Sequence, residues 1–287
     1  MIVEGKSRYH VALAFPGMSM SYGASRGHWL CSSGGHTIRP INAGGSWDNF
    51  NALLASALNA IRDGATHMAM IHSDVEPLES EFRWLDILLS EMDRLGLDLA
   101  SCSIAIKDWP ILRGVCSCGI GDPGDPWHPY KRFTVRECIA IGKTFCASDV
   151  GYDGWPLLHN NGLWCADLRS PIFRQTDNEG NLKAFFNFPK RVYLDAKDGK
   201  YKVDGFSEDW WFSMRLWELG AKTAICPQVK IDHVEGRMRW PNYVPFGIYT
   251  DGDEDTRYKW GPVENRMVSK RGTTLPVADV NASEGQA

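Results

Sequence analysis

The sequence predicts an α/β protein with a mostly parallel central sheet flanked by helices. Residues 10–15 and 67–71 are short, almost wholly apolar segments, which is typical of strands buried on both faces. Between them, apolar side chains recur at helical spacing over residues 50–61. A strand–helix–strand order of this kind favours parallel strands joined by right-handed crossovers.

The flanking residues place the boundaries of these elements. The first helix is predicted to begin after Ser46 and to end at Gly64, and a second helix to begin after Ser80 and to end at Gly96. Residues 99–106 form a further apolar segment and are predicted to be the third strand. The first half of the chain therefore has a βαβαβ order.

The second half of the chain is less regular. Gly119–Pro129 is dense in Gly, Pro and Asp, which predicts a loop, and Arg132–Ile141 is predicted to be an extended strand. Residues 164–173 are strand-like, and 177–200 are predicted to form a hairpin or a covering flap. Asp209–Leu219 is an apolar-rich helix.

Composition and charge narrow the function classes. The 287 residues are 44% apolar and 23% charged, as in ordinary globular enzymes, and they suffice for one large domain or two small ones. A net charge of −4 argues against generic electrostatic capture of nucleic acid. Eight cysteines without a CxxC pair, and no long apolar run or signal-peptide core, predict a cytoplasmic protein.

Two carboxylates follow the apolar segment 67–71. Asp74 and Glu76 are spaced i, i+2, and Pro77 follows them. The carboxyl end of a buried strand is where ligands bind in open α/β sheets. Carboxylate oxygens there suit Mg²⁺ or Mn²⁺ holding a diphosphate. A solvated turn leading into the next helix explains the same residues.

A second acidic pair, Glu208 and Asp209, opens the helix predicted after Ser207. One interpretation is local, because Ser207 can cap the helix and acidic residues in its first turn complement the helix dipole. The other is catalytic, because a carboxylate in an apolar setting can accept a proton from a hydroxyl. The aromatic residues that follow, beginning with Trp210, favour such a setting.

Further polar residues support either a structural or a functional interpretation. His233 follows Asp232 after a strand-like stretch, and a lone histidine is often structural. Asn160-Asn161-Gly162 is explained by a turn, although its amides can also bind hydroxyl groups. The sequence has no GxxxxGK[ST] or GxSxG motif, which argues against P-loop and serine-hydrolase functions.

Taken in order, these motifs resemble the nucleotide-sugar-dependent glycosyltransferases of the GT-A fold, most strongly the polysaccharide-synthase-like group. Residues 64–77 are similar to that family's helix end, strand and DxD-type motif, with Glu76 in the third position. Residues 206–220 are similar to its Glu-Asp motif at a helix start, and His233 falls where many members carry a metal-binding histidine.

The resemblance implies a role for each candidate residue. The implied metal ligands for Mn²⁺ or Mg²⁺ are Asp74, Glu76 and His233. The implied nucleotide-sugar contacts are Pro16, Gly17, Ser19, Asn51 and Asp74. Asp209 would be the catalytic base, with Glu208 in reserve, and the implied acceptor contacts are Asn161, Gly162 and Trp210.

The resemblance also implies a domain layout. Residues 1–250 would form one GT-A catalytic domain with a Rossmann-like sheet. Its nucleotide-binding half would span about 1–110, and its acceptor-binding half, with a small antiparallel sheet, about 111–250. Residues 251–287 form a polar tail, which would either fold over the phosphates as a lid or stay exposed.

The implied reaction moves a hexose from a UDP- or GDP-sugar to an acceptor hydroxyl, with inversion if Asp209 is the base. A retaining outcome, with Asp209 positioning the acceptor, stays open. So do two other functions: a metal-dependent nucleotidyltransferase and a non-catalytic carbohydrate-binding protein. The acceptor class is also open, from small polyols and glycans to a hydroxylated base in nucleic acid.

Overall fold

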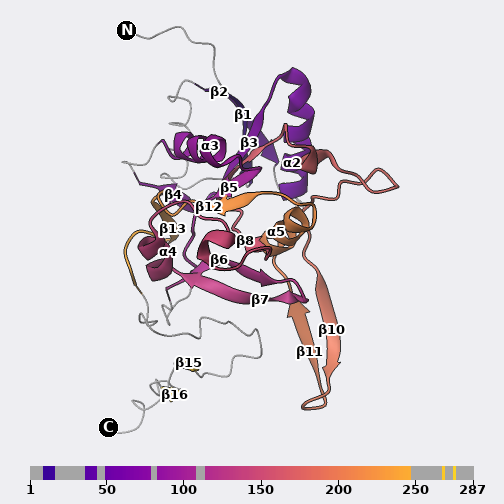
Figure 1. The fold of residues 1–287 in the computed structure, drawn as a ribbon, viewed down its shortest axis with the longest axis vertical. Helices are drawn as coiled ribbons and strands as arrows, with labels where there is room; N and C mark the ends of the chain where they lie inside the picture. Colours follow the sequence, from indigo (N-terminus) through magenta and orange to yellow (C-terminus); the bar gives the residue numbers. More distant parts are fainter. Residues whose placement is uncertain are drawn as a thin grey trace.

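The computed structural model describes most of the chain as a mixed α/β fold (Figure 1). A six-stranded central sheet carries helices, and small antiparallel sheets complete the molecule. The described residues are 9–16, 36–43, 49–78, 83–107 and 114–246, with two short strands, β15 (Met267–Val268) and β16 (Thr274–Leu275). Apart from those two strands, the predicted tail 251–287 lies outside the described residues.

The central sheet is mostly parallel, as the sequence predicts. In spatial order its strands are β12 (Thr223–Ile225), β5 (Leu99–Ser101), β9 (Leu163–Asp167), β3 (His67–Ile71), β1 (His10–Pro16) and β2 (Thr37–Ala43). β1 runs parallel to β2 and β3, and β12 parallel to β5. β9 is the exception, because it lies antiparallel between β3 and β5.

Two helices cover the sheet and match the predicted segments. They are α2 (Asn49–Ala60), continued by the 3-10 turn η2 (Ile61–Asp63), and α3 (Trp84–Leu95). Gly64 and Gly96 end them with φ of 91° and 62°, as predicted. Arg83 takes the N-cap position of α3, and the predicted caps Ser46 and Ser80 lie outside the described residues.

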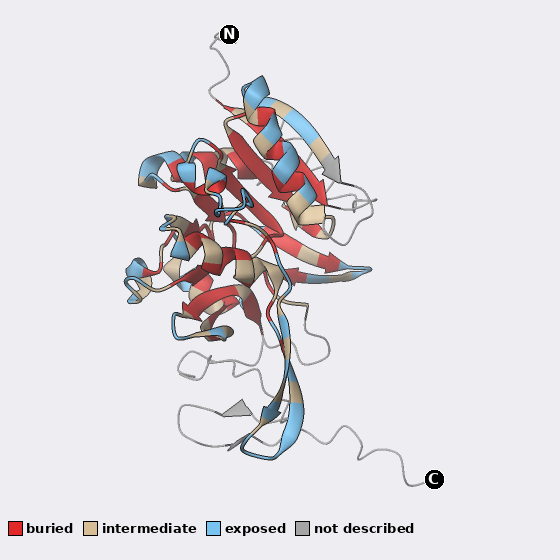
Figure 2. Ribbon diagram, turned by 90° about the vertical axis from the view of Figure 1, so that its right-hand side faces the viewer, coloured by how far each residue is buried: buried red, intermediate tan, exposed pale blue. Residues whose placement is uncertain are grey.

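The core lies on both faces of this sheet. Alternate residues of β1 point to opposite faces, so that Val11 and Leu13 join the cluster packed by α3, whereas Ala12 and Ala14 join the cluster packed by α2. All five residues of β3 are buried. Figure 2 shows this buried layer passing through the middle of the molecule.

The segment after β5 differs from its prediction. Only residues 99–101 of the predicted strand 99–106 are regular. The predicted loop Gly119–Pro129 is wrong, because it lies in a hairpin of β6 (Val115–Asp122) and β7 (Asp125–Thr134), to which β8 (Leu157–Leu158) adds a third strand. Gly119 is needed there because a Cβ would stand 2.2 Å from the Lys131 carbonyl oxygen.

The predicted strand Arg132–Ile141 is wrong beyond Thr134, where α4 (Val135–Ile141) begins. A capping box explains the switch. The Thr134 hydroxyl accepts from the Glu137 amide at 3.1 Å, and the Glu137 carboxylate accepts from the Thr134 amide at 2.7 Å. The reciprocal bonds satisfy two amides that a helix start otherwise leaves without partners.

The remaining elements are a small sheet, two 3-10 turns, one helix and one hairpin. β4 (Val75–Pro77), β13 (Ile231–Glu235) and β14 (Met238–Pro241) form an antiparallel sheet. The 3-10 turns are η4 (Ser148–Val150) and η5 (Pro171–Arg174), and the helix predicted near residue 209 is α5 (Glu208–Glu218). The hairpin of β10 (Lys190–Asp195) and β11 (Lys200–Gly205) projects from the body (Figures 1 and 2).

Candidate functional site

Asp74 stands where β3 gives way to β4, and three basic side chains converge on it. His72 Nδ1 donates to Asp74 Oδ1 at 2.5 Å, and Lys107 Nζ donates to Oδ2 at 2.5 Å. His233 Nε2 lies 3.4 Å from Oδ2. β13 brings His233 there, because it pairs with β4 and the Val234 amide donates to the Asp74 carbonyl at 2.8 Å.

These contacts set the electrostatics of Asp74. Burial by itself would raise the pKa of this carboxyl, but the contacts with His233, His72 and Lys107 hold the pKa well below its usual range. Asp74 is therefore a permanent anion that is only 28% exposed. Such a group suits a fixed charge that holds a ligand, and it is poorly suited to taking up a proton.

The orientation of His233 bears on metal binding. Its Nδ1 lies 2.8 Å from the carbonyl oxygen of Ala105, which can only accept, so Nδ1 carries a proton. In a neutral imidazole, Nε2 is then an acceptor that faces another acceptor, Asp74 Oδ2. A proton on Nε2 that is donated to Asp74, or a cation between the two atoms, accounts for this contact.

Glu76 belongs to a neighbouring cluster. Its carboxylate accepts from Arg239 Nη1 at 2.7 Å, and the same Nη1 donates to Asp232 at 3.0 Å. In the β4–β13 ladder Glu76 is opposite Asp232, whereas His233 is opposite Val75. Because successive side chains of a strand alternate in direction, Glu76 and His233 point to opposite faces. The structure brings Asp74 and His233 together and pairs Glu76 with Arg239.

The second acidic pair opens α5. Ser207 is the N-cap, as the sequence suggested, and its hydroxyl accepts from the Trp210 amide at 3.4 Å. Burial raises the pKa of Glu208, and it raises the pKa of Asp209 well above the usual range, with the negative charge of Glu208 adding to the effect. Asp209 is therefore a strong proton acceptor once ionised.

A chain of hydrogen bonds connects Asp209 to the Asp74 cluster. Asn160 Nδ2 donates to Asp209 Oδ2 at 3.0 Å, and Asn160 Oδ1 accepts from the Gly162 amide at 2.5 Å. The Gly162 carbonyl accepts from the His72 amide at 2.7 Å. Gly162 is confined, since a Cβ would lie 2.7 Å from Asn160 Oδ1. The chain links the Asp209 carboxylate to the backbone of His72, two residues before Asp74.

Asn161 lies within this connection and is 2% exposed. Among the described residues, neither its side-chain oxygen nor its nitrogen has a hydrogen-bond partner. Leaving a buried amide unsatisfied costs about 1–3 kcal/mol. The amide of Asn161 is therefore a buried polar group whose hydrogen bonds the described residues do not supply.

The other residues predicted for the site lie elsewhere or have other partners. Asn51 exchanges two hydrogen bonds of 2.8 Å with the backbone of Phe186, which occupies its amide. Trp210 is 5% exposed, donates to the Ser117 carbonyl at 2.8 Å and has the Arg132 guanidinium over its ring. Pro16 is buried at the end of β1. Gly17 and Ser19 lie outside the described residues.

Sequence reasoning missed Lys107 and Arg239. Lys107 follows β5, 33 positions after Asp74, and Arg239 comes from β14. Neither has a spacing pattern relative to its acidic partner, because both contacts form only in the assembled fold. His72 was adjacent to the acidic pair in the sequence, which was the one available signal.

Comparisons with known proteins give weak likenesses only. No family model and no curated protein matches the sequence. Among solved structures, A197 from STIV is 12% identical, with a TM-score of 0.40 over 84% of this chain and 95% of its own. A mannose-1-phosphate geranyltransferase from Thermus thermophilus is 12% identical, with a TM-score of 0.31 over 57% and 60%. At these TM-scores neither likeness supports a functional argument.

None of the helices in the described part of the chain is both long enough and apolar enough to cross a bilayer.

Proposed function

We propose that this chain is a glycosyltransferase that moves a hexose from a UDP- or GDP-sugar to an acceptor hydroxyl. The observation that carries the proposal is the pairing of two unlike carboxylates in one site. Asp74 is held ionised by basic neighbours, whereas the pKa of Asp209 is raised. Asn160 bonds to Asp209 and to the Gly162 amide, and the Gly162 carbonyl accepts from the amide of His72, two residues before Asp74. A fixed anion and a proton acceptor are the two groups that this transfer needs.

Asp209 is the base in this proposal. Its carboxylate takes the proton of the acceptor hydroxyl while the hydroxyl oxygen attacks the anomeric carbon. The bond between that carbon and the diphosphate oxygen breaks, and the nucleoside diphosphate leaves with the electron pair. Attack from the opposite side inverts the configuration. Glu208 is the reserve candidate for the base. In a retaining enzyme, Asp209 would instead position the acceptor without deprotonating it.

The donor diphosphate is assigned to the Asp74 cluster. Asp74 and His233 would hold Mn²⁺ or Mg²⁺, whereas Glu76 points to the other face and is paired with Arg239. When bound, such an ion stabilises the negative charge of the departing diphosphate. Lys107 and His72 supply further donors for phosphate oxygens, and each of them already lies within hydrogen-bond distance of Asp74.

The acceptor is assigned to the segment between the two carboxylates. Asn161 offers a buried amide without a partner among the described residues, and Gly162 lets Asn160 Oδ1 and the Ile104 and Val75 side chains pack closely beside it. A hydroxyl bound by that amide would lie near Asp209, because Asn160 contacts Asp209 directly. The acceptor can be a small polyol, a glycan or a hydroxylated nucleobase, since all three present a free hydroxyl.

Lys107 favours nucleotidyl transfer as the second candidate function. That chemistry needs a lysine on the triphosphate, and the segment after β5 supplies one beside Asp74. In this alternative a sugar phosphate attacks a nucleoside triphosphate, and pyrophosphate leaves.

The products separate the two reactions. The chain is incubated with Mn²⁺ and either a panel of UDP- and GDP-hexoses or a nucleoside triphosphate with a hexose 1-phosphate. We expect nucleoside diphosphate from the first mixture and no pyrophosphate from the second. Pyrophosphate release would replace the proposal with nucleotidyl transfer. Binding without either product would indicate a carbohydrate-binding protein.

A further inference from the structure

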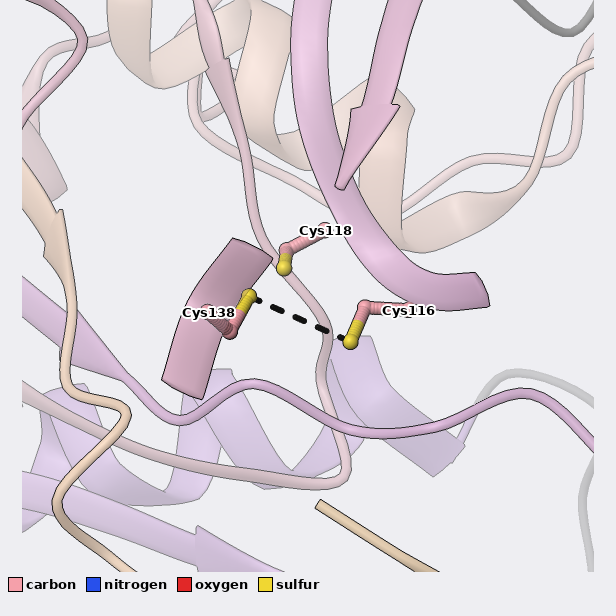
Figure 3. Close-up of side chains that lie close together, drawn as sticks. All are labelled: Cys116, Cys118 and Cys138. Atoms are coloured by element: carbon pink, nitrogen blue, oxygen red, sulfur yellow. Dashed lines mark hydrogen bonds between the residues drawn. The ribbon is translucent and has the colours of Figure 1, made fainter. Parts of the chain in front are cut away.

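Three cysteines converge in the hydrophobic cluster around β6, β7 and α4 (Figure 3). Cys116 and Cys118 are two positions apart on β6 and therefore lie on the same face of that strand, and Cys138 comes from α4. The Sγ atoms of Cys116 and Cys138 are 4.0 Å apart, and all three Sγ atoms lie within 4.8 Å of one another. All three side chains are fully buried.

We propose that Cys116, Cys118 and Cys138 bind a thiophilic divalent d¹⁰ metal ion, Zn²⁺ or a chemical equivalent. Zinc–thiolate bonds are about 2.3 Å long, which places sulfurs that share one ion roughly 3.8–4.0 Å apart. The separation of 4.0 Å between Cys116 and Cys138 already matches this spacing. Binding replaces the thiol protons, which pass to solvent, and no oxidant or reductant is needed.

The chemistry of the pocket selects the ion. Hard ions such as Mg²⁺ and Mn²⁺ prefer oxygen ligands, so the thiol cluster and the Asp74 cluster differ in the ion they favour. Three thiolates around a divalent ion leave one net negative charge, whereas a monovalent ion would leave two. Because an uncompensated charge is costly in an apolar core, the divalent ion fits better. The fourth coordination position is left to a non-protein ligand.

Buried cysteines often serve only as small hydrophobic residues, and this cluster does pack among Ile120, Phe133 and Val135. One observation sets it apart. Within the described residues, no other three His, Cys, Asp or Glu side chains bring their ligand atoms this close together.

The metal would stabilise an element that supports the candidate site. β6 bonds to the segment 104–107 through Ser117 N to the Ile104 carbonyl at 2.8 Å and Ile106 N to the Val115 carbonyl at 2.9 Å. That segment carries Lys107 and the carbonyl that orients His233. The inference about the metal nevertheless stands on the three sulfurs alone and does not depend on the proposed function.

Metal content tests the inference. The full chain is produced with zinc in the medium, kept reduced and exchanged into metal-free buffer, and bound zinc is measured per chain. Cd²⁺ is then added, and its thiolate charge-transfer absorption is followed in the ultraviolet. We expect one zinc per chain and a cadmium absorption that saturates at one equivalent. An excess of Mn²⁺ should displace neither ion.

Two serine variants locate the site. Cys138→Ser should lose both the zinc and most of the cadmium absorption. Cys165→Ser removes an equally buried thiol from β9, outside the cluster, and should keep both. Wild-type protein without stoichiometric zinc and without the absorption overturns the inference, whether or not Cys138→Ser folds. Full binding by a folded Cys138→Ser also overturns it. A chelator should lower the melting temperature of wild type and leave that of Cys138→Ser unchanged.

Discussion

Asp74 and Asp209 are the same side chain in opposite electrostatic settings. Asp74 lies among His72, Lys107 and His233, and its pKa is held below the usual range. Asp209 lies beside Glu208 in a drier setting, and its pKa is raised. The ionised form is stabilised at Asp74 and destabilised at Asp209.

The two settings suit different tasks, because the first favours binding of cations and the second favours proton transfer. A carboxylate whose pKa is lowered holds cations and phosphate-binding groups without taking up protons, whereas a carboxylate whose pKa is raised gains affinity for a proton near neutral pH. In the proposed function, a ligand that contacts both carboxylates would meet both properties.

Replacing the proton acceptor should have the largest effect. Asp209→Asn keeps the shape of the side chain and removes the base, so we expect kcat for sugar transfer to fall by about 10²–10⁴-fold with donor affinity almost unchanged. Steady-state kinetics with the donor identified in the panel measures both. Glu218→Gln, at the exposed end of the same helix, is the matched control. A fall of less than threefold in Asp209→Asn would remove it from the chemistry.

Replacing the fixed anion should instead weaken donor binding. Asp74→Asn should raise the Kd for a nucleoside diphosphate with Mn²⁺ by tenfold or more, because it removes the charge assigned to the ion. Glu76→Gln is the matched control, since Glu76 is paired with Arg239, and it should change the Kd by less than threefold. Calorimetric titration gives both values. Equal losses in the two variants would mean that Glu76 is also a ligand.

The two replacements should shift stability in opposite directions. A lowered pKa contributes stability above the ordinary carboxyl pKa, and this is lost as pH falls through the folded value; a raised pKa costs stability as pH rises. At pH 7 we therefore expect Asp74→Asn to lose about 1–3 kcal/mol of unfolding free energy and Asp209→Asn to lose none or to gain. Urea unfolding at pH 7 and pH 4 should show the gap narrowing at pH 4. Shifts of the same sign would contradict the two settings.

The smallest effect concerns the pH dependence. Because Asp209 must be ionised to act, activity should be full above its raised pKa and should decline as pH falls through that value, at a higher pH than an ordinary aspartate would give. Asn160→Ala removes a donor to the carboxylate and should move this decline to a still higher pH. Profiles of kcat/KM against pH measure the shift. A move to lower pH would show that Asn160 does not stabilise the anion.

The sequence predicts those parts of the fold that depend on local signals. The strands β1 and β3 are continuous apolar segments, and Gly64 and Gly96 end their helices in a conformation that glycine favours. Gly119 was misleading for a physical reason: it serves close contact between paired strands, and in the sequence this looks the same as a glycine in a loop.

The residues of the candidate site also fall into two groups, those that local sequence signals predict and those that depend on the assembled fold. Asp74, His233 and Asp209 stand out in the sequence because each follows a recognisable strand or opens a helix. Their partners do not, because the approach of Lys107 to Asp74 and of Arg239 to Glu76 depends on how distant strands pair. The antiparallel position of β9 within the sheet is likewise a property of the assembled fold.

The most direct test of the central claim is anomalous diffraction at the manganese edge from crystals grown with Mn²⁺ and the nucleoside diphosphate that binds most tightly. We expect one manganese peak in contact with Asp74, His233 and the diphosphate, on the side that faces Asp209. A diphosphate bound elsewhere, or held by Lys107 and His72 with no manganese beside Asp74, would contradict the account.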